Sequence, residues 1–481
     1  MQFFKKYYGL VLILILSFWA VKPFFVSGFF PIHDDTQIAR VFEMGKVLQN
    51  GVFPVRVVPD LGYGYGYPIF NFYAPLAYYV GAAFMFLGFD ALVAAKIMMA
   101  LGIILAGIFM YFLAREFFGE FGGIASGLFY LYAPYHAVDI YVRGDVAEFW
   151  AYAFIPLAFL GFYKRNILLG TIGFAGLILS HNLTAMMITP FLLIVVLLNC
   201  YIAFKNKKSF IFNHPSLIFI LSLAISAFYW IPALAEMKYT NVLSQIGGGA
   251  DFRDHFVCIE QLWNSVWGFG GSVAGCIDGL SFKIGKLHIL ASIAAFVLTL
   301  CVNKIRKSKN GEIIFLSFLG FFLSVFLTLE VSKSIWEAIP AMAFFQYPWR
   351  FLILISFFAS LLAGSLIYLL KQIKIKPYLT ATALVFFLLF FDLKLFVPQT
   401  ILSKTAENYT NEITLKWNVS KISDEYLPPN FKKPKNPSEV RKGPPIIGIK
   451  ETDVEKASNV VSLGGLLALV LGIILLKKGY E

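Results

Sequence analysis

The chain has 481 residues, of which 59% are hydrophobic, 17% aromatic and only 14% charged. A soluble protein of this length carries nearer a quarter charged residues, so the composition excludes a soluble globular enzyme and indicates a polytopic, all-α membrane protein. The formal net charge is +12 at pH 7. In a membrane protein such an excess lies mostly in cytoplasmic loops and contacts anionic lipid, so it does not indicate a nucleic-acid partner.

About 12 apolar stretches are long enough to be predicted as membrane-spanning helices. The first is interpreted as an uncleaved span, because Lys5 and Lys6 precede it and no small-residue cleavage site follows. The predicted spans lie at about 8–30, 92–113, 119–135, 147–163, 167–183, 184–202, 215–234, 287–303, 312–329, 350–370, 377–397 and 459–476.

Basic residues cluster at alternate junctions between these stretches, as at Lys164-Arg165 and Lys371–Lys376. The positive-inside rule then predicts a multi-pass protein of the cytoplasmic membrane with both termini in the cytoplasm. Residues 1–397 are predicted to form one transmembrane domain. Its outer loops are expected at 31–90 and 236–286, followed by a short extracytoplasmic tail at 398–458 and a last span within 459–481.

Residues 70–89 are apolar enough to cross the membrane, but a crossing here would place every later basic cluster outside. We therefore expect an interfacial or re-entrant helix on the outer face. Residues 35–50 are predicted to form an amphipathic helix along the surface, with Ile38, Val41, Phe42 and Leu48 facing lipid.

Paired carboxylates follow the first span directly, in the sequence His33-Asp34-Asp35. Charge next to hydrocarbon is poorly solvated, so the pair costs free energy unless something binds it. Asp34 and Asp35 are therefore predicted to hold a divalent cation such as Mg²⁺ or Mn²⁺, or to supply a general base beside a lipid-borne substrate. The structural alternative is an ordinary helix end capped by Asp.

A second polar cluster precedes the span at 147–163 and contains Asp139, Arg143, Asp145 and Glu148. The spacing of three places Asp145 and Glu148 on one face of the following helix, and Glu148 is expected to face the helix bundle. Arg143 is predicted either to bind a phosphate or to neutralise the carboxylates of its own loop.

Three further segments contain candidate substrate-binding residues. His181 interrupts an apolar run at a third outer turn and is a candidate acid, base or ligand, or a hydrogen-bonded turn histidine. Trp349 and Arg350 open another span, where Arg350 is predicted to bind a lipid phosphate or to anchor the interface. Tyr67 ends a Gly/Tyr loop whose rings would stack on sugars or simply form a turn.

Four cysteines occur, and no spacing typical of a zinc site is present. Cys258 and Cys276 lie in the same predicted outer loop. On an oxidising face they are expected to form a disulfide, with two free thiols as the alternative.

Several of these segments together resemble a family of bacterial and archaeal membrane proteins described as 6-pyruvoyl-tetrahydropterin synthase-related. More remotely, the chain is similar to the YfhO-type membrane proteins and to the GT-C glycosyltransferases. The stretches that carry the resemblance are His33-Asp34-Asp35, Gly66–Leu76, Tyr141–Glu148, Ser180-His181-Asn182, Tyr347–Phe351 and Asp424–Pro428.

The GT-C resemblance implies a multi-helix membrane enzyme that transfers a sugar from a polyprenyl-phosphate donor to a glycan, lipid or protein acceptor on the outer face. In that pattern Asp34 or Asp35 would be the base or metal ligand. The second acid would fall at Asp139, Asp145 or Glu148, and Arg350 or Arg143 would bind the lipid phosphate. Two other functions stay open, because charge at helix ends also suits a transporter or flippase, and internally paired acids would suit a noncatalytic envelope-assembly protein.

Overall fold

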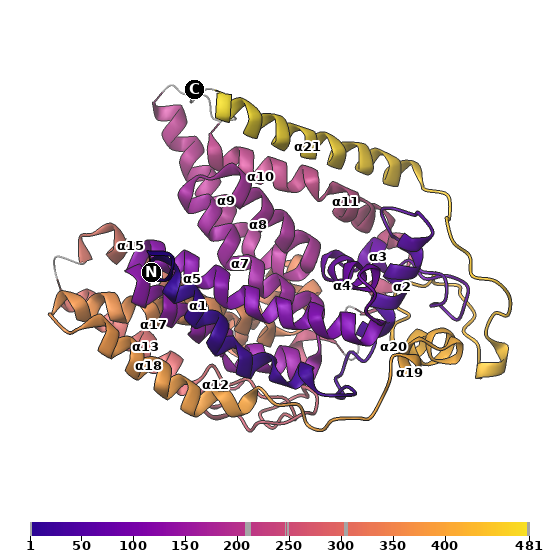
Figure 1. Ribbon diagram of the computed structural model, residues 1–481, viewed down its shortest axis with the longest axis horizontal. Coiled ribbons are helices and arrows are strands. Elements are labelled where there is room, and N and C mark those ends of the chain that lie inside the picture. Colours follow the sequence, from indigo (N-terminus) through magenta and orange to yellow (C-terminus); the bar gives the residue numbers. More distant parts are fainter. Residues whose placement is uncertain (1, 207–212, 246, 248–249, 303–305, 479–481) are drawn as a thin grey trace. The chain divides into compact units, whose positions relative to one another are not determined.

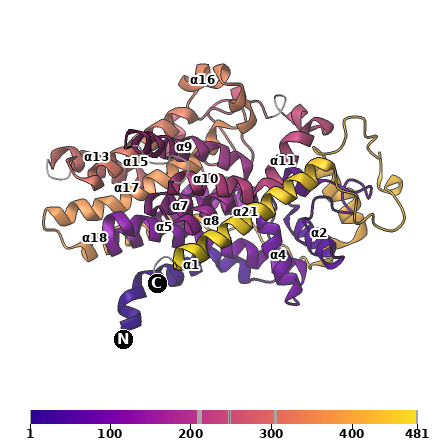
Figure 2. The same cartoon turned by 90° about the horizontal axis from the view of Figure 1, so that it is seen from above.

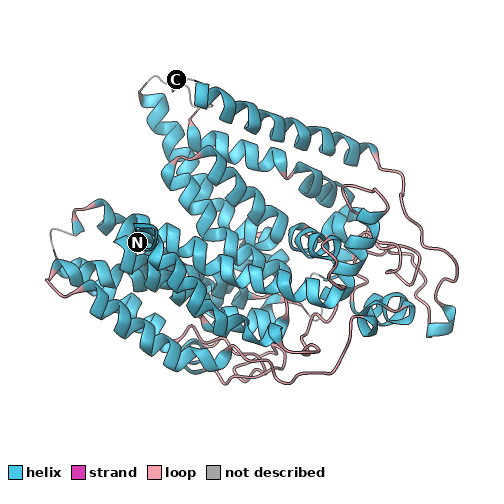
Figure 3. Ribbon diagram, viewed as in Figure 1, coloured by secondary structure: helices cyan, strands magenta, loops and turns pink. Residues whose placement is uncertain are grey.

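The computed structural model describes residues 2–206, 213–245, 247, 250–302 and 306–478. Within these ranges the regular structure is helical, and extended pairing is confined to isolated bridges such as the one between Phe29 and Leu402. Figure 3 shows the helices and the loops that join them. The all-α class predicted from the composition is therefore confirmed for the described residues.

The chain folds as two compact units, each assembled from three separate segments. The first unit contains 1–33, 100–145 and 246–402, and the second contains 34–99, 146–245 and 403–481. Residues of the stretch 1–397 contribute to both units, and the predicted transmembrane domain over this stretch stays a prediction.

Helices of the first unit include three that pack together, α13, α15 and α17, which Figure 2 shows as one group. Gly320 of α15 allows this packing, because a Cβ at that position would lie 2.4 Å from the ring of Phe358 in α17. The helices of this unit are α1 (Gln2–Val21), most of α5 (Ala91–Leu131), α6 (Pro134–Val138), α12 (Ile259–Asn264), α13 (Lys286–Cys301), α15 (Lys309–Thr328), α16 (Lys333–Ala338), α17 (Leu352–Gln372) and α18 (Pro377–Asp392).

The second unit contains the antiparallel helices α7 and α8, and a long C-terminal helix, α21, that runs alongside α10 and α11 (Figure 1). Its helices are α2 (Gln37–Gln49), α3 (Ile69–Phe72), α4 (Leu76–Phe86), α7 (Val146–Lys164), α8 (Ile167–Ser180), α9 (Asn182–Lys205), α10 (His214–Ile225), α11 (Ala227–Glu236), α19 (Glu407–Thr410), α20 (Ser420–Ile422) and α21 (Asp453–Lys478).

Eight helical stretches among the described residues are long and apolar enough to span a membrane, or up to nine if the bent pair α10–α11 is one span. The chain is accordingly a multi-pass integral membrane protein. This count, in which the stretch Ala91–Arg143 is taken as one candidate, does not show the predicted 12 spans. Two of the expected spans, α8 with 14 residues and α13 with 16, rise only about 21 and 24 Å, less than the roughly 30 Å hydrocarbon core.

Two further predicted spans, 92–113 and 119–135, belong to the single helical stretch α5. The stretch is interrupted at Gly119, where the backbone has φ 73° and ψ −174°. The chain folds back here, since a Cβ on Gly127 would lie 2.8 Å from the carbonyl oxygen of Gly107. A left-handed φ is easily adopted by glycine, which explains why the reversal occurs at this residue.

A break also divides the predicted span 215–234 into α10 and α11, which meet at an angle of 64°. The break exposes backbone groups that a continuous helix would pair. Ser462 of α21 accepts a hydrogen bond from the Phe228 N–H at 2.7 Å, and Arg56 donates to the Phe228 carbonyl oxygen, also at 2.7 Å. The bend is thus stabilised by partners from two other segments of the same unit.

The segment 70–89, predicted not to cross, forms α3 and the 11-residue α4. At about 16 Å, α4 is too short to span the hydrocarbon core. The preceding amphipathic helix is also present as α2, where Phe42 and Leu48 are partly exposed, but the prediction that Ile38 and Val41 face lipid is wrong. Both side chains are buried, and α2 packs on α4.

Candidate functional site

The hairpin formed by α7 and α8 is packed through glycines. A Cβ on Gly161 would lie 2.1 Å from the Cα of Gly170, and one on Gly173 would lie 2.7 Å from the Cα of Ala158. Small residues let helix backbones approach closely where no larger side chain intervenes. The register that these contacts set brings the start of α7 next to the end of α8.

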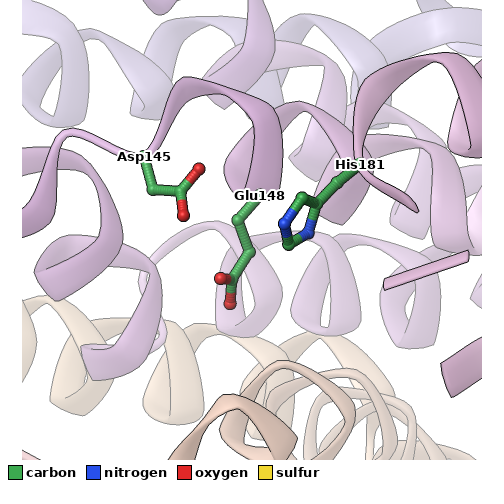
Figure 4. A group of neighbouring side chains, drawn as sticks. All are labelled: Asp145, Glu148 and His181. Atoms are coloured by element: carbon green, nitrogen blue, oxygen red, sulfur yellow. The ribbon is translucent and has the colours of Figure 1, made fainter. Parts of the chain in front are cut away.

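Glu148 and His181 meet at that end of the hairpin. Glu148 lies in the first turn of α7, and His181 lies between the last residue of α8 and the first of α9. A carboxylate oxygen of Glu148 and a ring nitrogen of His181 lie within 4.8 Å of each other, and Figure 4 shows the two side chains next to each other. Their exposed fractions are 1% and 6%, so the pair is shielded from solvent.

The His181 ring is oriented by a hydrogen bond within α9. Its Nδ1 lies 2.8 Å from the hydroxyl oxygen of Thr184. When the Nδ1–H donates to this hydroxyl, the ring lone pair is on Nε2, the nitrogen that then serves as base or ligand. A carboxylate and an oriented imidazole can together accept a hydrogen bond or proton from a substrate hydroxyl.

Asp34 and Asp35 lie in the turn before α2 and are half-buried. The Asp35 carboxylate lies 3.7 Å from the ammonium group of Lys404 in the C-terminal tail, and Lys404 also lies over the Tyr409 ring. Burial raises the pKa of Asp35, while the nearby Lys404 opposes that rise. Asp35 therefore has a cationic partner, Lys404, that could not be predicted from the sequence.

Asp34 acts electrostatically on Arg40 of α2, a buried guanidinium. Arg40 donates to the hydroxyls of Tyr78 at 3.4 Å and Ser423 at 3.2 Å, and it lies over the ring of Tyr73. Two basic side chains, Arg40 and Lys404, thus accompany the two carboxylates of this turn.

The divalent cation predicted at Asp34 and Asp35 does not fit these surroundings. Lys404 already lies beside Asp35, and among the described residues neither aspartate joins a cluster of three potential metal-ligating side chains. Mg²⁺ in particular requires near-octahedral oxygen coordination. Glu148 and His181 offer one oxygen and one nitrogen ligand, a mixed donor set that suits Zn²⁺ better than Mg²⁺.

Arg143, a predicted phosphate ligand, belongs to the first unit and is bound within its own loop. Its guanidinium forms ion pairs with Asp139 at 2.5 Å and Asp145 at 2.8 Å, and it donates to the Tyr135 hydroxyl at 3.2 Å. It also lies 4.8 Å from the centre of the Trp349 ring. This arrangement matches the alternative in which Arg143 neutralises the carboxylates of its loop.

Arg350 and Trp349 are also engaged within the first unit. Arg350 donates to the Phe345 carbonyl oxygen at 2.9 Å and to the Gln346 side chain at 3.0 Å. Trp349 is buried between Tyr347 and Phe282, with ring centres 4.9 and 5.8 Å away. Trp349 is thus a packed core side chain. The hydrogen bonds of Arg350 stabilise the turn that precedes α17.

Tyr67 of the Gly/Tyr loop is fully buried, so its ring does not form an open platform for a sugar. Its hydroxyl lies 3.3 Å from the Ser423 hydroxyl and accepts a hydrogen bond from the Tyr426 N–H at 3.3 Å. Of the two interpretations of this loop, sugar stacking or a structural turn, the structural one fits Tyr67. Its hydrogen bonds connect the loop to the tail segment 423–426.

Cys258 and Cys276 form a disulfide in the first unit, with their Cα atoms 5.6 Å apart. This is the pair expected from their shared loop. Cys200 and Cys301 are not part of a disulfide, and the Cys200 sulfur lies 3.4 Å from the Ser216 hydroxyl oxygen.

Sequence reasoning missed a buried polar network around Arg56. Besides Phe228, its guanidinium donates to Asn71 at 3.2 Å and to Asn459 of α21 at 2.8 Å, and it lies 3.6 Å from Glu455. Neither the spacing nor the type of these residues marks them as partners, because they are separated by up to 403 positions in the chain. What the sequence does show is a charged residue, Arg56, inside the predicted outer loop 31–90.

Comparison with known proteins shows a distant relative but assigns no family. No protein-family model matches the chain. An uncharacterized protein of Lactococcus lactis subsp. cremoris (strain MG1363) is 27% identical over 252 residues, which is 49% of this chain and 41% of the relative. The matched region thus spans less than half the length of that curated relative, whose name describes no activity.

Proposed function

We propose that the protein is a membrane glycosyltransferase that moves a sugar from a polyprenyl-phosphate donor to an acceptor hydroxyl on the extracytoplasmic face. The observation that carries the proposal is the buried pair of Glu148 and His181 at the ends of apolar helices. Burying a carboxylate and an imidazole costs free energy, and such groups within membrane helices are typical of functional sites. The resemblance to GT-C enzymes supplies the reaction class.

The proposed reaction is a single displacement at the anomeric carbon. The acceptor oxygen bonds to this carbon, and the bond from the carbon to the phosphate oxygen breaks with its electron pair passing to the phosphate. The proton of the acceptor hydroxyl passes to Asp34 or Asp35. The products are the glycosylated acceptor, with inverted configuration, and the polyprenyl phosphate.

Each side chain has a distinct role in this proposal. Asp34 or Asp35 is the base, and Glu148, oriented beside His181, accepts a hydrogen bond from a hydroxyl of the sugar or acceptor. All four residues belong to the second unit, although more than a hundred positions of the chain separate the two aspartates from Glu148 and His181. The Lys404 ammonium group lies 3.7 Å from the Asp35 carboxylate, and in the proposal it stabilises the negative charge that develops on the leaving phosphate.

The direct test is consumption of a polyprenyl-phosphate sugar by the purified chain in proteoliposomes. Donors with hexose and pentose headgroups are supplied together with candidate acceptors, and release of polyprenyl phosphate is measured. Replacing both carboxylates, by Asp34→Asn with Asp35→Asn, should lower the rate by at least about 100-fold. The matched control is Asp254→Asn, an exposed carboxylate of another loop. Equal rates in the double variant and the wild type would contradict the assignment.

A transporter is the second candidate, and the broken span α10–α11 favours it specifically. Discontinuous helices with exposed backbone groups line the substrate sites of many secondary transporters. Here, however, the groups at the break are bound by Ser462 and Arg56, so this break is internally satisfied. Movement of an intact lipid-linked sugar across the bilayer, without release of its phosphate, would favour the transporter.

A further inference from the structure

A groove of about 660 Å³ lies in the second unit between α8, α10 and α21. Its walls are mostly aliphatic, and among the described residues that line it Arg165 and His214, at one end, are basic. The aliphatic side chains of the walls include Ile167, Leu168, Leu217, Leu221, Leu469 and Ile473. A volume of this size is within the usual range for a small-molecule or lipid site.

Two glycines of α21 show how the groove opens. At Gly465 the helix touches α10, because a Cβ there would lie 2.8 Å from the Cβ of Ala224. Ser462 reinforces the contact by donating to the Ala224 carbonyl oxygen at 3.1 Å. At Gly472, two turns or about 10 Å further along the helix, nothing lies within 4 Å of a Cβ. The two helices therefore diverge toward the end of the groove that carries Arg165 and His214.

The charge at that end is suitably placed for an anion. Arg165, in the turn between α7 and α8, is exposed, and its guanidinium is held by the Asn199 side chain at 2.9 Å. His214 is the first residue of the 12-residue helix α10, where the helix dipole also favours negative charge. The basic pair Lys164-Arg165 belongs to the clusters that the positive-inside rule predicts to be cytoplasmic.

We propose that this groove binds an anionic phospholipid of the cytoplasmic leaflet. The phosphate contacts Arg165 and His214, and an acyl chain lies along the aliphatic walls between α10 and α21. Basic pockets between membrane helices are known to bind anionic headgroups, and a guanidinium forms charge-assisted, bidentate hydrogen bonds with phosphate. Lipid is the occupant best matched to these walls, because α21 is a candidate span with only 17% of its apolar window buried.

The test measures binding of phosphatidylglycerol to the purified full-length chain in detergent, by native mass spectrometry and by the shift of the melting temperature. Phosphatidylglycerol should bind and raise the melting temperature, whereas phosphatidylcholine and water-soluble glycerol phosphate should not. Arg165→Gln together with His214→Gln should weaken phosphatidylglycerol binding by at least about tenfold, while Arg165→Lys should retain most of it.

Two glycine variants test whether lipid binding depends on the groove itself or on α21 in general. Gly472→Leu places a side chain in the open groove and should abolish the lipid-dependent rise in melting temperature. Gly464→Leu is the matched control, because nothing lies within 4 Å of a Cβ there either and Gly464 does not line the groove. Equal phosphatidylglycerol binding by the wild type, Gly472→Leu and the Arg165/His214 double variant would overturn the proposal. Selective loss in these variants would support it whether or not the protein is a transferase.

Discussion

Two buried clusters of ionisable side chains contain carboxylates that are close together in the sequence, but these carboxylates have different partners. In the first unit, the guanidinium of Arg143 binds both Asp139 and Asp145, and the Trp349 ring covers it. In the second unit, Glu148 lies beside His181, whose other ring nitrogen is oriented by Thr184. A guanidinium is a cation that only donates hydrogen bonds, whereas a neutral imidazole also has a ring nitrogen that can accept one. The first cluster is therefore suited to stabilise a loop, and the second is suited to proton chemistry.

Replacing the carboxylate of the second cluster should have the largest effect on activity. Glu148→Gln keeps the size of the side chain but removes its charge, so donor consumption is expected to fall by about 100-fold or more. The melting temperature should change little, because the amide can still form hydrogen bonds. Activity within threefold of the wild type would show that Glu148 is a structural residue like Asp139.

Replacing the cation of the first cluster should instead affect stability. Arg143→Met leaves the buried carboxylates of Asp139 and Asp145 without their ion pair, which is expected to lower the free energy of unfolding by about 3–5 kcal/mol. Arg253→Met, which removes an exposed ion pair, is the control and should leave the unfolding transition unchanged. If the two variants unfold alike, the Arg143 cluster does not stabilise its loop.

The partner of Asp35 gives a smaller effect that depends on pH. Lys404→Met should lower the transfer rate by about tenfold at neutral pH, since one charge-assisted contact to the phosphate is lost. It should also raise the pKa of Asp35 further, because Lys404 opposes the effect of burial. The base acts as a carboxylate, so activity falls as pH drops through this pKa. The acidic limb of the rate profile should therefore move to higher pH, and an unmoved limb would exclude Asp35 as the base.

The smallest effect is expected from the hydroxyl that orients His181. Thr184→Val preserves the shape of the side chain but removes the oxygen 2.8 Å from Nδ1. Transfer should decrease several-fold, toward the lower end of the range for partners that orient a functional histidine. Thr184→Ser retains the hydroxyl and should restore the rate. Equal rates in both variants would mean that the ring orientation does not matter.

Much of the helical organisation could be predicted from hydropathy, but the number of spans could not. The reversal at Gly119 and the break between α10 and α11 occur inside continuous apolar runs, where composition alone gives no boundary. The disulfide partners could be predicted because both cysteines lie in one short loop. The burial of Ile38 and Val41 could not, because an amphipathic face looks the same whether it meets lipid or another helix such as α4.

The candidate acids were recognisable because charge next to apolar runs is unusual. The side chains that contact these acids were harder to recognise from the sequence. The proximity of Glu148 and His181 follows from the short turn at Lys164–Asn166 and the glycines of α7 and α8, a packing register that a hydropathy pattern does not reveal. Lys404 pairs with Asp35 across 369 positions (404 minus 35). No local pattern predicts such a contact, since it depends on how the tail folds onto the loop before α2.

The central claim is that the protein breaks the bond between a sugar and a lipid phosphate. It is tested most directly by a single-turnover reaction of purified protein in sealed proteoliposomes, with a donor labelled in both the sugar and the lipid. The account predicts that the two labels separate, leaving unglycosylated polyprenyl phosphate and an inverted glycoside, and that Asp34→Asn with Asp35→Asn prevents this. Passage of the doubly labelled donor to the opposite leaflet with its sugar still attached would contradict it.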